Sequence, residues 1–561
     1  MMKKTIGLVL RVIGCLLAVG ILFWFELPPI HLRSHLFWDF LFHCIVVCSI
    51  IVFIPKVLGF IRRILGGGTG DIEFSLKSGE KGFFKRIPLA VRVIGGSLIF
   101  IVVFSTVMTI IGARLFHAGG YSSLIALKDG DFSADVAELS MSQIPVVDRD
   151  TATRLGQRKL GEMSDLVSQF IIEDDYTQIN YRGRPTRVTP LGYADLIKWF
   201  TNSDEGIPAY IMVDLTTQDV KLVRLSELGL GNMRYSRSEY LYHHLDRYLR
   251  FKYPTKIFGE VSFEIDDNGT PYWVASVIDY KIGFWDGADV QGAVILNAVT
   301  GESEYYSLEQ VPGWVDQVYG ESMILEQLID NGSLKNGFWN SVFGQQGCVK
   351  PTEGYNYIAK DDDVWLYTGI TSVTADESNI GFVLVNLRTK DARYYVQAGA
   401  EEYSAMGSAE GQIQEKNYIS TFPILLNVGG RPTYFMSLKD DAGLVKMYAY
   451  VDMAQYQIVG TGSTVDKARE AYLLLLQDEN IETDITVEEE SVRTVEGTVS
   501  ALAQAVVDGN TQYYIRLKGK DETYVLAASL SDALPFLKIG DKLTITYQND
   551  VVTAVQVGAK S

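Results

Sequence analysis

The seven residues Leu-Asn-Ala-Val-Thr-Gly-Glu, at positions 296–302, lie between two runs with strand character. The apolar run 292–296 leads into them, and Glu-Tyr-Tyr follows at 304–306. Asn and Thr side chains hydrogen-bond readily to nearby backbone groups, which favours a tight reversal of the chain. A polar turn between two β-prone runs therefore predicts a β-hairpin at this point.

The same pattern recurs along the chain as an aliphatic residue, Asp or Asn, two residues, Thr, one residue and an acid. Copies are found at 213–219, 296–302 and 385–391, and a degenerate copy begins at Val451. An earlier turn accompanies each copy, at 183–186, 268–271, 360–363 and 430–433. A fixed internal pattern of this kind is typical of structural repeats.

Helix-like segments separate these hairpins. Residues 150–170, 236–251, 313–330 and 400–417 precede the four copies, and 463–476 follows the last with Thr464 as its expected N-cap. We therefore expect an α+β fold in which one helix and about four antiparallel strands occur four times. The expected bounds are 121–148 for a linker or first strand, 149–235 for repeat 1, 236–311 for repeat 2, 312–398 for repeat 3, and 399–477 for repeat 4 with a closing helix.

Three apolar stretches near the N-terminus are long enough to cross a bilayer, which needs about 20 residues. They run from Thr5 to Leu27, from Leu36 to Ile61 and from Pro88 to Phe116. The basic loop between the last two, about 56–88, carries most of the positive charge of this region, so the positive-inside rule places it and the N-terminus in the cytoplasm. We expect a multi-pass plasma-membrane protein, with residues 1–120 as its membrane region and residues from about 117 onward outside the cytoplasm.

Charge is distributed very unevenly along the 561 residues. Residues 1–120 contain 13 Lys and Arg against 5 Asp and Glu, whereas the rest contains 37 against 63, and the whole chain has a formal charge of −18. An acidic body argues against nucleic acid as a partner. The basic loop either docks on anionic lipid headgroups or only fixes the topology.

The C-terminal part has a different pattern. Residues 478–490 are acidic and predict a solvated linker. Residues 491–561 alternate apolar and polar side chains over five short stretches, which predicts a small β-barrel, and their order resembles an OB-fold. A weak version of a nucleic-acid-binding face is offered by Tyr513, Tyr514, Tyr524, Arg516, Lys518 and Lys520. A protein or glycan partner, or a purely structural cap, agrees better with a location outside the cell.

Residues that could perform catalysis or bind a metal are scarce in the exterior part. It contains three histidines, His117, His243 and His244, and one cysteine, Cys348. We find no nucleophile elbow, zinc-protease, P-loop, dinucleotide-binding or paired-cysteine motif. Asp361–Asp363 could bind calcium, but a solvated hairpin turn explains it more simply. We therefore predict no catalytic, cofactor-binding or metal-binding residues, no cofactor and no enzymatic activity.

The helix followed by an antiparallel sheet ending in Asn-Ala-Val-Thr-Gly-Glu resembles the PepSY family, whose small cystatin-like modules commonly end in a hairpin of the form Asp-Ala-x-Thr-Gly-Glu. The resemblance covers about 150–475 and is closest in the second copy. The first copy has Thr-Gln-Asp at 217–219, and the fourth lacks the turn threonine. The chain as a whole also resembles multi-span proteins of Gram-positive bacteria with such exteriors. This resemblance implies peptidase binding or inhibition, or a structural role at the cell surface.

Three functions stay open from the sequence. The first is a membrane-anchored, non-enzymatic scaffold or complex subunit that contacts membrane lipid and binds another envelope protein through PepSY-like repeats. The second is an extracytoplasmic peptidase inhibitor or regulator. The third is a carboxylate-based hydrolase, which would need two acids converging in one cleft with raised pKa values. The partner, the oligomeric state and the packing of the repeats do not follow from the sequence.

Overall fold

The computed structural model describes residues 2–65, 89–139, 143–481, 483, 493–507, 510–520, 522–531, 533–548 and 551–558. The chain divides into two compact units, Met1–Glu479 and Asn480–Ser561. Residues 66–88 of the predicted basic loop and most of the predicted acidic linker lie outside the described residues.

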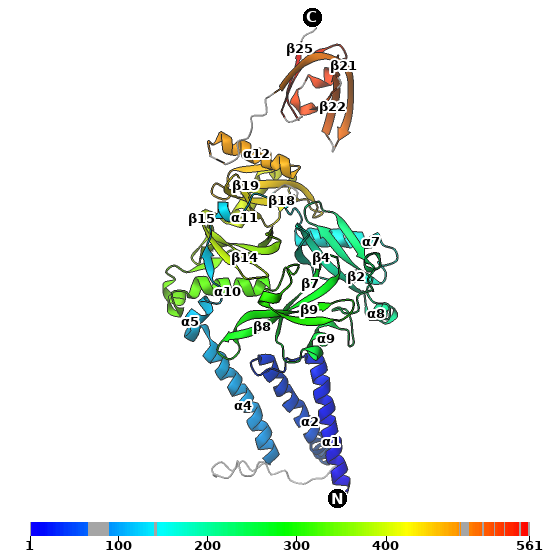
Figure 1. The fold of residues 1–561 in the computed structure, drawn as a ribbon, viewed down its shortest axis with the longest axis vertical. Coiled ribbons are helices and arrows are strands. Elements are labelled where there is room, and N and C mark those ends of the chain that lie inside the picture. The colour runs from blue at the N-terminus through cyan, green and yellow to red at the C-terminus, as the bar shows by residue number, and fades with distance from the viewer. Residues whose placement is uncertain are drawn as a thin grey trace. The chain divides into compact units, whose positions relative to one another are not determined.

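Three long apolar helices begin the first unit: α1 (Met2–Glu26), α2 (His35–Leu65) and α4 (Leu89–Gly112) (Figure 1). Their segments Thr5–Glu26, His35–Phe53 and Val91–Gly112 are apolar over 22, 19 and 22 residues, which is enough to cross a membrane. The third helix ends earlier than the sequence predicts, and a short kinked helix, α5 (Arg114–Ser122), follows it. The three candidate spans agree with a membrane protein.

The described part of the first unit then contains four sheets, each preceded by a helix, and we call each helix with its sheet a sheet group. The first group has α7 (Arg149–Gly161) and β2 (Phe170–Ile172), β3 (Thr177–Tyr181), β4 (Arg184–Tyr193), β5 (Ala209–Asp214) and β6 (Val220–Arg224), with α8 (Leu196–Asn202) between β4 and β5. The second has α9 (Leu245–Lys252) and β7 (Phe258–Ile265), β8 (Pro271–Ile282), β9 (Asp286–Asn297) and β10 (Ser303–Ser307).

The third group has α10 (Glu321–Leu334) and β11 (Val349–Pro351), β12 (Asn356–Lys360), β13 (Asp363–Ser372), β14 (Ala375–Asn386) and β15 (Ala392–Ala400). The fourth has α11 (Glu402–Gln412), β16 (Ile419–Ser420), β17 (Ile424–Val428), β18 (Arg431–Lys439), β19 (Val445–Asp452) and β20 (Val459–Gly462), and α12 (Val465–Asp478) follows it. Strands within each group pair antiparallel, and β1 (Leu127–Asp129) adds a parallel edge to β15.

The repeated motif forms the turn between the last two long strands of a group. In the second group, Asn297 Oδ1 accepts hydrogen bonds from the amides of Val299 and Thr300, both at 2.9 Å. Gly301 then has a φ of 76°, a left-handed conformation that glycine adopts without cost. Asp214 and Asn386 accept the same pair of amide hydrogen bonds in the first and third groups.

The residue after each Asx joins the turn to the start of its own group. Its carbonyl accepts hydrogen bonds from the segment entering the helix: Leu215 from Val146, Ala298 from Tyr235, Leu387 from Tyr319 and Met453 from Ala400. Its amide donates to a residue at the beginning of an earlier strand: Pro185, Pro271, Val364 and Pro432, in the same order. We call this arrangement the turn–helix joint, and it is equivalent in all four groups.

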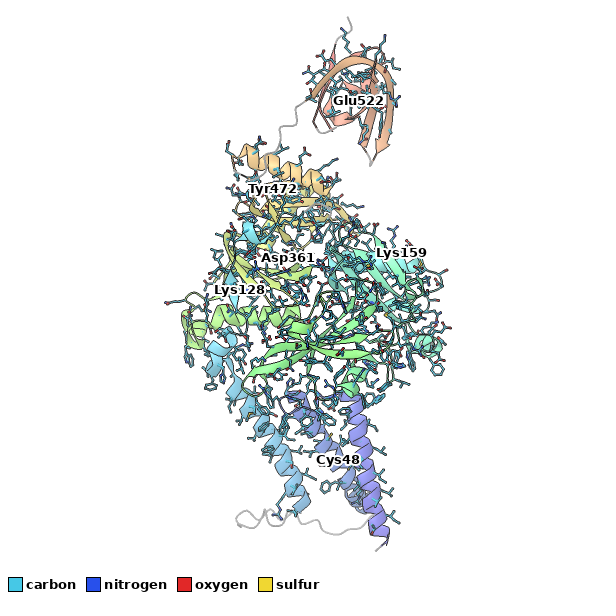
Figure 2. The ribbon with its side chains drawn as sticks, in the orientation of Figure 1. Cys48, Lys128, Lys159, Asp361, Tyr472 and Glu522 are labelled. Carbon is cyan, nitrogen blue, oxygen red and sulfur yellow. The ribbon has the colours of Figure 1, made fainter. Side chains whose placement is uncertain are left out.

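The sheets share cores with their neighbours because strands of the third group bury both faces. Val383 and Val385 of β14 pack in one cluster with Ile295 of the second group and Ile324 of α10. Phe382 and Leu384, which point to the opposite face, pack in another cluster with Tyr434 of the fourth group. Successive side chains of a strand alternate between faces, so β14 connects two cores. On the fourth group, the buried Tyr472 of α12 bonds with Asp452 at 2.9 Å (Figure 2).

The sheet groups contact the three candidate spans directly, at the ends of the helices that adjoin them. Arg250 donates to Leu27 O at 2.9 Å, and the guanidinium of Arg247 lies 4.2 Å from the ring centroid of Trp24. Arg33, between α1 and α2, donates to Phe284 O at 3.1 Å. Arg114, just beyond α4, pairs with Asp330 at 2.6 Å. Backbone and charged contacts thus join all three spans to the sheet groups.

The predicted helix 236–251 is wrong over most of its length, because α9 includes only Leu245–Lys252. The amide of Leu245 donates to Ser236 O instead of forming a helical bond. Arg247 Nη1 donates hydrogen bonds to the carbonyl oxygens of Tyr240 and Leu241, at 2.9 and 2.7 Å. A helix through 236–244 would need these groups for its own i to i−4 bonds. The predicted N-cap Thr464 is confirmed, since its hydroxyl accepts from Lys467 N at 3.2 Å.

The second unit is a five-stranded antiparallel sheet in the order β23-β22-β21-β24-β25. Its strands are β21 (Arg493–Val507), β22 (Asn510–Leu517), β23 (Thr523–Ala527), β24 (Lys542–Gln548) and β25 (Val551–Gly558). The long β21 pairs with β22 along one part and with β24 along another. Ile515, Leu526 and Ile545 form the centre of its core and are fully buried.

Candidate ligand-binding cavity

A cavity of about 630 Å³ lies where the four sheet groups meet. Its wall includes the start of α7 with β3 and β4 of the first group, β7 of the second, β12 and the first residue of α10 of the third, and Phe422 of the fourth. Cavities that hold small molecules have volumes of about 300–1,000 Å³. Acidic, basic and tyrosine side chains make up much of this wall.

Two carboxylates converge on one side of the cavity. Glu260 lies on β7 at a register shift in its pairing with β8, and Glu321 is the first residue of α10. Burial, followed by the charge of Glu321 and a hydrogen bond with it, raises the pKa of Glu260 to about 7. Tyr355 donates its hydroxyl to Glu321 at 3.3 Å. Neither carboxylate forms an ion pair within the described residues.

Gly320 lies directly beside the carboxylate of Glu260. A Cβ on Gly320 would overlap the carboxylate of Glu260, so the glycine lets β7 approach the start of α10. A β-bulge re-aims the side chain that it carries, and the register shift between Phe258 and Val261 falls at this part of the strand. Backbone geometry thus brings two residues 61 positions apart together.

A buried cation lines the same cavity. Arg187 is in the middle of β4, opposite Gln178 of β3, and only 6% of its surface is exposed. Its Nη2 donates to Gln178 Oε1 at 3.2 Å, whereas Arg187 Nε and Gln178 Nε2 have no hydrogen-bond partner among the described residues. The same part of the chain places no carboxylate within ion-pairing distance of the guanidinium. Burial without a counter-ion disfavours the charged form and lowers the pKa of Arg187.

Several other charged groups at the cavity have charged protein partners. Asp175 pairs with Arg237 at 3.2 Å, and Asp148 pairs with Lys439 at 2.7 Å. Behind the wall, Glu264 accepts from the amides of Asp316 and Gln317 at 2.8 and 3.1 Å. Burial raises the pKa of Glu264 to about 7. Arg149 and Asp174 also line the cavity without an ion pair among the described residues, although Arg149 donates to the backbone O of Asp174 at 2.7 Å. Arg187 differs from them because it is buried, and Glu260 and Glu321 differ because they lie in contact with each other.

The residues that the sequence singled out lie elsewhere. His243 precedes α9 and His244 is its N-cap residue, and neither lines the cavity. Cys348 is buried, with its thiol 3.4 Å from Ser333 O. Asp361 and Asp362 form the β12–β13 turn, in agreement with the hairpin interpretation, and Asp363 pairs with Arg388 at 2.6 Å. The described residues contain no group of three or more His, Cys, Asp and Glu that could hold a metal.

The aromatic residues proposed for a binding face in the second unit are mostly internal. Tyr513 and Tyr524 belong to its core and are 6% and 7% exposed. Stacking on bases or sugars needs an exposed ring face. These two tyrosines therefore support the sheet rather than a binding surface.

Sequence reasoning missed Arg187, Glu260 and Glu321. Arg187 directly follows the repeated Gly-Arg-Pro-Thr turn, and it interrupts a strand whose other residues from 186 to 193 are all buried. A lone arginine inside such a strand is a usable signal, because unpaired charges are rarely buried. Nothing in the sequence indicates that Glu260 and Glu321 meet, since their contact depends on how two sheet groups pack.

Comparison with known proteins does not place the chain in a family. No family model matches, and no curated protein matches. A levansucrase mutant from B. megaterium aligns over 78% of this chain and 97% of its own length, with 10% identity and a TM-score of 0.16. The levansucrase from Bacillus subtilis aligns over 75% of this chain and 92% of its own length, with 9% identity and a TM-score of 0.17. Similarity at this level carries no argument about fold or function.

Proposed function

We propose that the chain is a membrane-anchored, extracytoplasmic scaffold or complex subunit without catalytic activity, which binds another protein of the cell envelope. In this proposal the N-terminus and the loop at about 56–88 face the cytoplasm, and residues from about 117 onward are outside. The three candidate spans and the basic charge before residue 120 support it.

The proposed binding body consists of four tandem PepSY-like repeats, followed by an OB-like barrel at 491–561. The equivalent turn–helix joint in all four sheet groups supports the repeats. The strand order of the second unit, with the long β21 between β22 and β24, supports the barrel.

The single observation that carries the scaffold proposal is the direct fastening of the body to its spans. Arg247 links Trp24 at the end of α1 to the carbonyls of Tyr240 and Leu241. Leu241 and Tyr242 are 58% and 52% exposed at this junction, and such residues suit the membrane interface. A body held in this way presents its surfaces at one height above the bilayer, as assembly with a membrane neighbour requires.

Co-purification tests this proposal. The tagged full-length chain is isolated from native membranes in a mild detergent, and the bound proteins are quantified by mass spectrometry against an unrelated tagged three-span protein. We expect one envelope protein at a constant ratio to the chain in several detergents. Isolation of the chain alone in each detergent would contradict the scaffold, and slowing of an envelope peptidase by the same preparation would favour the regulator alternative.

A second candidate is the carboxylate-based hydrolase, because Glu260 and Glu321 converge in one cavity and the pKa of Glu260 is raised to about 7. Two carboxyl groups that share a proton can act as a general acid and base. The test is turnover of peptide and glycan mixtures by the full-length protein. Products that the unaltered protein forms and that neither Glu260→Gln nor Glu321→Gln forms would support the hydrolase. Products that either variant still forms would exclude it.

A further inference from the structure

The cavity has a buried cation on one wall and two adjacent carboxylates on another, and none of these three groups is in an ion pair among the described residues. On the wall formed by the first sheet group, Arg187 and Gln178 are more than nine-tenths buried, and each has an N–H group without an acceptor among the described residues. A buried donor without a partner costs about 1–3 kcal/mol, so this arrangement needs an explanation. An oxygen-rich anionic group placed between the two side chains would satisfy both donors.

On the wall formed by the second and third groups, Glu260 and Glu321 face the cavity, and no cation of the described residues lies within ion-pairing distance of either. The charge of Arg237 lowers the pKa of Glu260 from farther away, but less than burial and Glu321 raise it. Two carboxylates in contact repel each other when both are ionised. A positively charged donor with several N–H bonds would relieve this repulsion. A primary ammonium group has three such bonds and one positive charge.

The charges of Arg187 and of the two glutamates act on the same space, since all three change the pKa of Tyr357. Burial raises the pKa of the Tyr357 hydroxyl most, the charges of Glu321 and Glu260 raise it further, and the charge of Arg187 lowers it. Arg187 and the two glutamates are nevertheless not paired with each other in the described structure. The two walls therefore hold their opposite charges apart, across a polar cavity of about 630 Å³.

We propose that this cavity binds a small zwitterion with a free carboxylate and a free primary amine, namely an amino acid or a short peptide. The carboxylate lies against Arg187 and Gln178, and the ammonium lies between Glu260 and Glu321. A simple anion would leave the glutamate pair unneutralised, and a simple cation would leave Arg187 unneutralised. A terminus of a large protein carries only one of the two charges, so the ligand is a small molecule with both.

Binding of trialanine to the full-length protein in detergent, measured by calorimetry, tests the site. Trialanine is compared with its N-acetyl and its C-amide derivatives. We expect each derivative to bind about tenfold more weakly, because each loses a charge-assisted hydrogen bond with one wall. No binding of trialanine at millimolar concentrations, or equal binding of all three peptides, overturns the proposal.

Variants assign each end of the ligand to its wall. Arg187→Gln should remove the preference for the free carboxylate and keep the preference for the free amine, and Glu321→Gln should do the reverse. Arg184→Gln and Glu205→Gln, which change exposed residues outside the cavity, should alter neither preference. Circular dichroism of each variant is measured to check that it folds. If either cavity variant left both preferences unchanged, the assignment would be wrong.

The zwitterion site does not depend on the scaffold proposal. Failure to co-purify a partner leaves the peptide measurements unaffected. Failure to bind trialanine leaves the search for an envelope partner unaffected. The two experiments therefore fail separately.

Discussion

Replacing Arg187 by Met should make the ligand-free protein more stable. The guanidinium belongs to a residue that is only 6% exposed, its Nε has no partner, and no carboxylate of the described residues neutralises it. Burial of an ion costs several kcal/mol, and replacing buried charges by apolar residues of similar volume is often stabilising by about 1–4 kcal/mol. Methionine fills most of the arginine stem, so we expect a gain in the free energy of unfolding of about 1–3 kcal/mol.

The matched control is Arg388→Met in the third sheet group. Arg388 donates to both carboxylate oxygens of Asp363, at 2.6 and 2.8 Å, and the side chain of Asp363 is only 7% exposed. Its removal leaves a buried carboxylate without its cation, which costs about 3–5 kcal/mol. The two arginines thus differ in the sign of the expected effect.

The assay is denaturant unfolding of the full-length protein in detergent without peptide, followed by tryptophan fluorescence. The midpoint should rise for Arg187→Met and fall for Arg388→Met. The reasoning about Arg187 is refuted if Arg187→Met lowers the unfolding free energy by about 1 kcal/mol or more, since the arginine would then be an ordinary structural residue.

The remaining predictions concern contacts within the first unit. Burial raises the pKa values of Glu260 and Glu264 to about 7, above their unfolded values. The stabilising contribution of these two groups is therefore complete below about pH 4.5 and is lost as the pH rises through 7. Glu260→Gln should reduce the fall in the unfolding midpoint between about pH 5 and 8. Gly301→Ala should lower the free energy of unfolding by about 1–3 kcal/mol, because φ is 76° and the new Cβ would overlap Tyr235. The control Gly183→Ala, with φ 77° and open space around it, should lower it only by the backbone strain of about 1 kcal/mol. Equal unfolding free energies of the two variants would contradict this. Arg247→Met should free the carbonyls of Tyr240 and Leu241 and speed amide hydrogen exchange in 236–245 but not in β14. An unchanged exchange rate in 236–245 would show that Arg247 does not hold this segment in place.

The repeated elements could be predicted from sequence because local patterns determine them. The Asx side chains at 214, 297 and 386 form their turns through bonds to residues two or three positions away. The alternation along β14 likewise comes from the strand itself. The apolar spans needed only length and composition.

The cavity could not be predicted because it depends on packing between groups. Glu260 and Glu321 meet only after β7 and α10 are brought together, and Gly320 permits it. The predicted helix over 236–244 is absent for a related reason. Arg247, which contacts Trp24, donates to the carbonyls that a helix would use for its own hydrogen bonds. Interactions between distant segments overrode local helical periodicity in that case.

The turn–helix joint has a consequence for how such a body can change over time. Its four carbonyl acceptors, at residues 215, 298, 387 and 453, and their amide donors all belong to the main chain. Mutation of side chains does not remove main-chain bonding groups, except by proline. Duplicated modules joined in this way are free to drift apart in sequence while their architecture is inherited. The four turns read DLTTQD, NAVTGE, NLRTKD and DMAQYQ, and the fourth closes one residue later than the others, yet the same main-chain joint forms in all four.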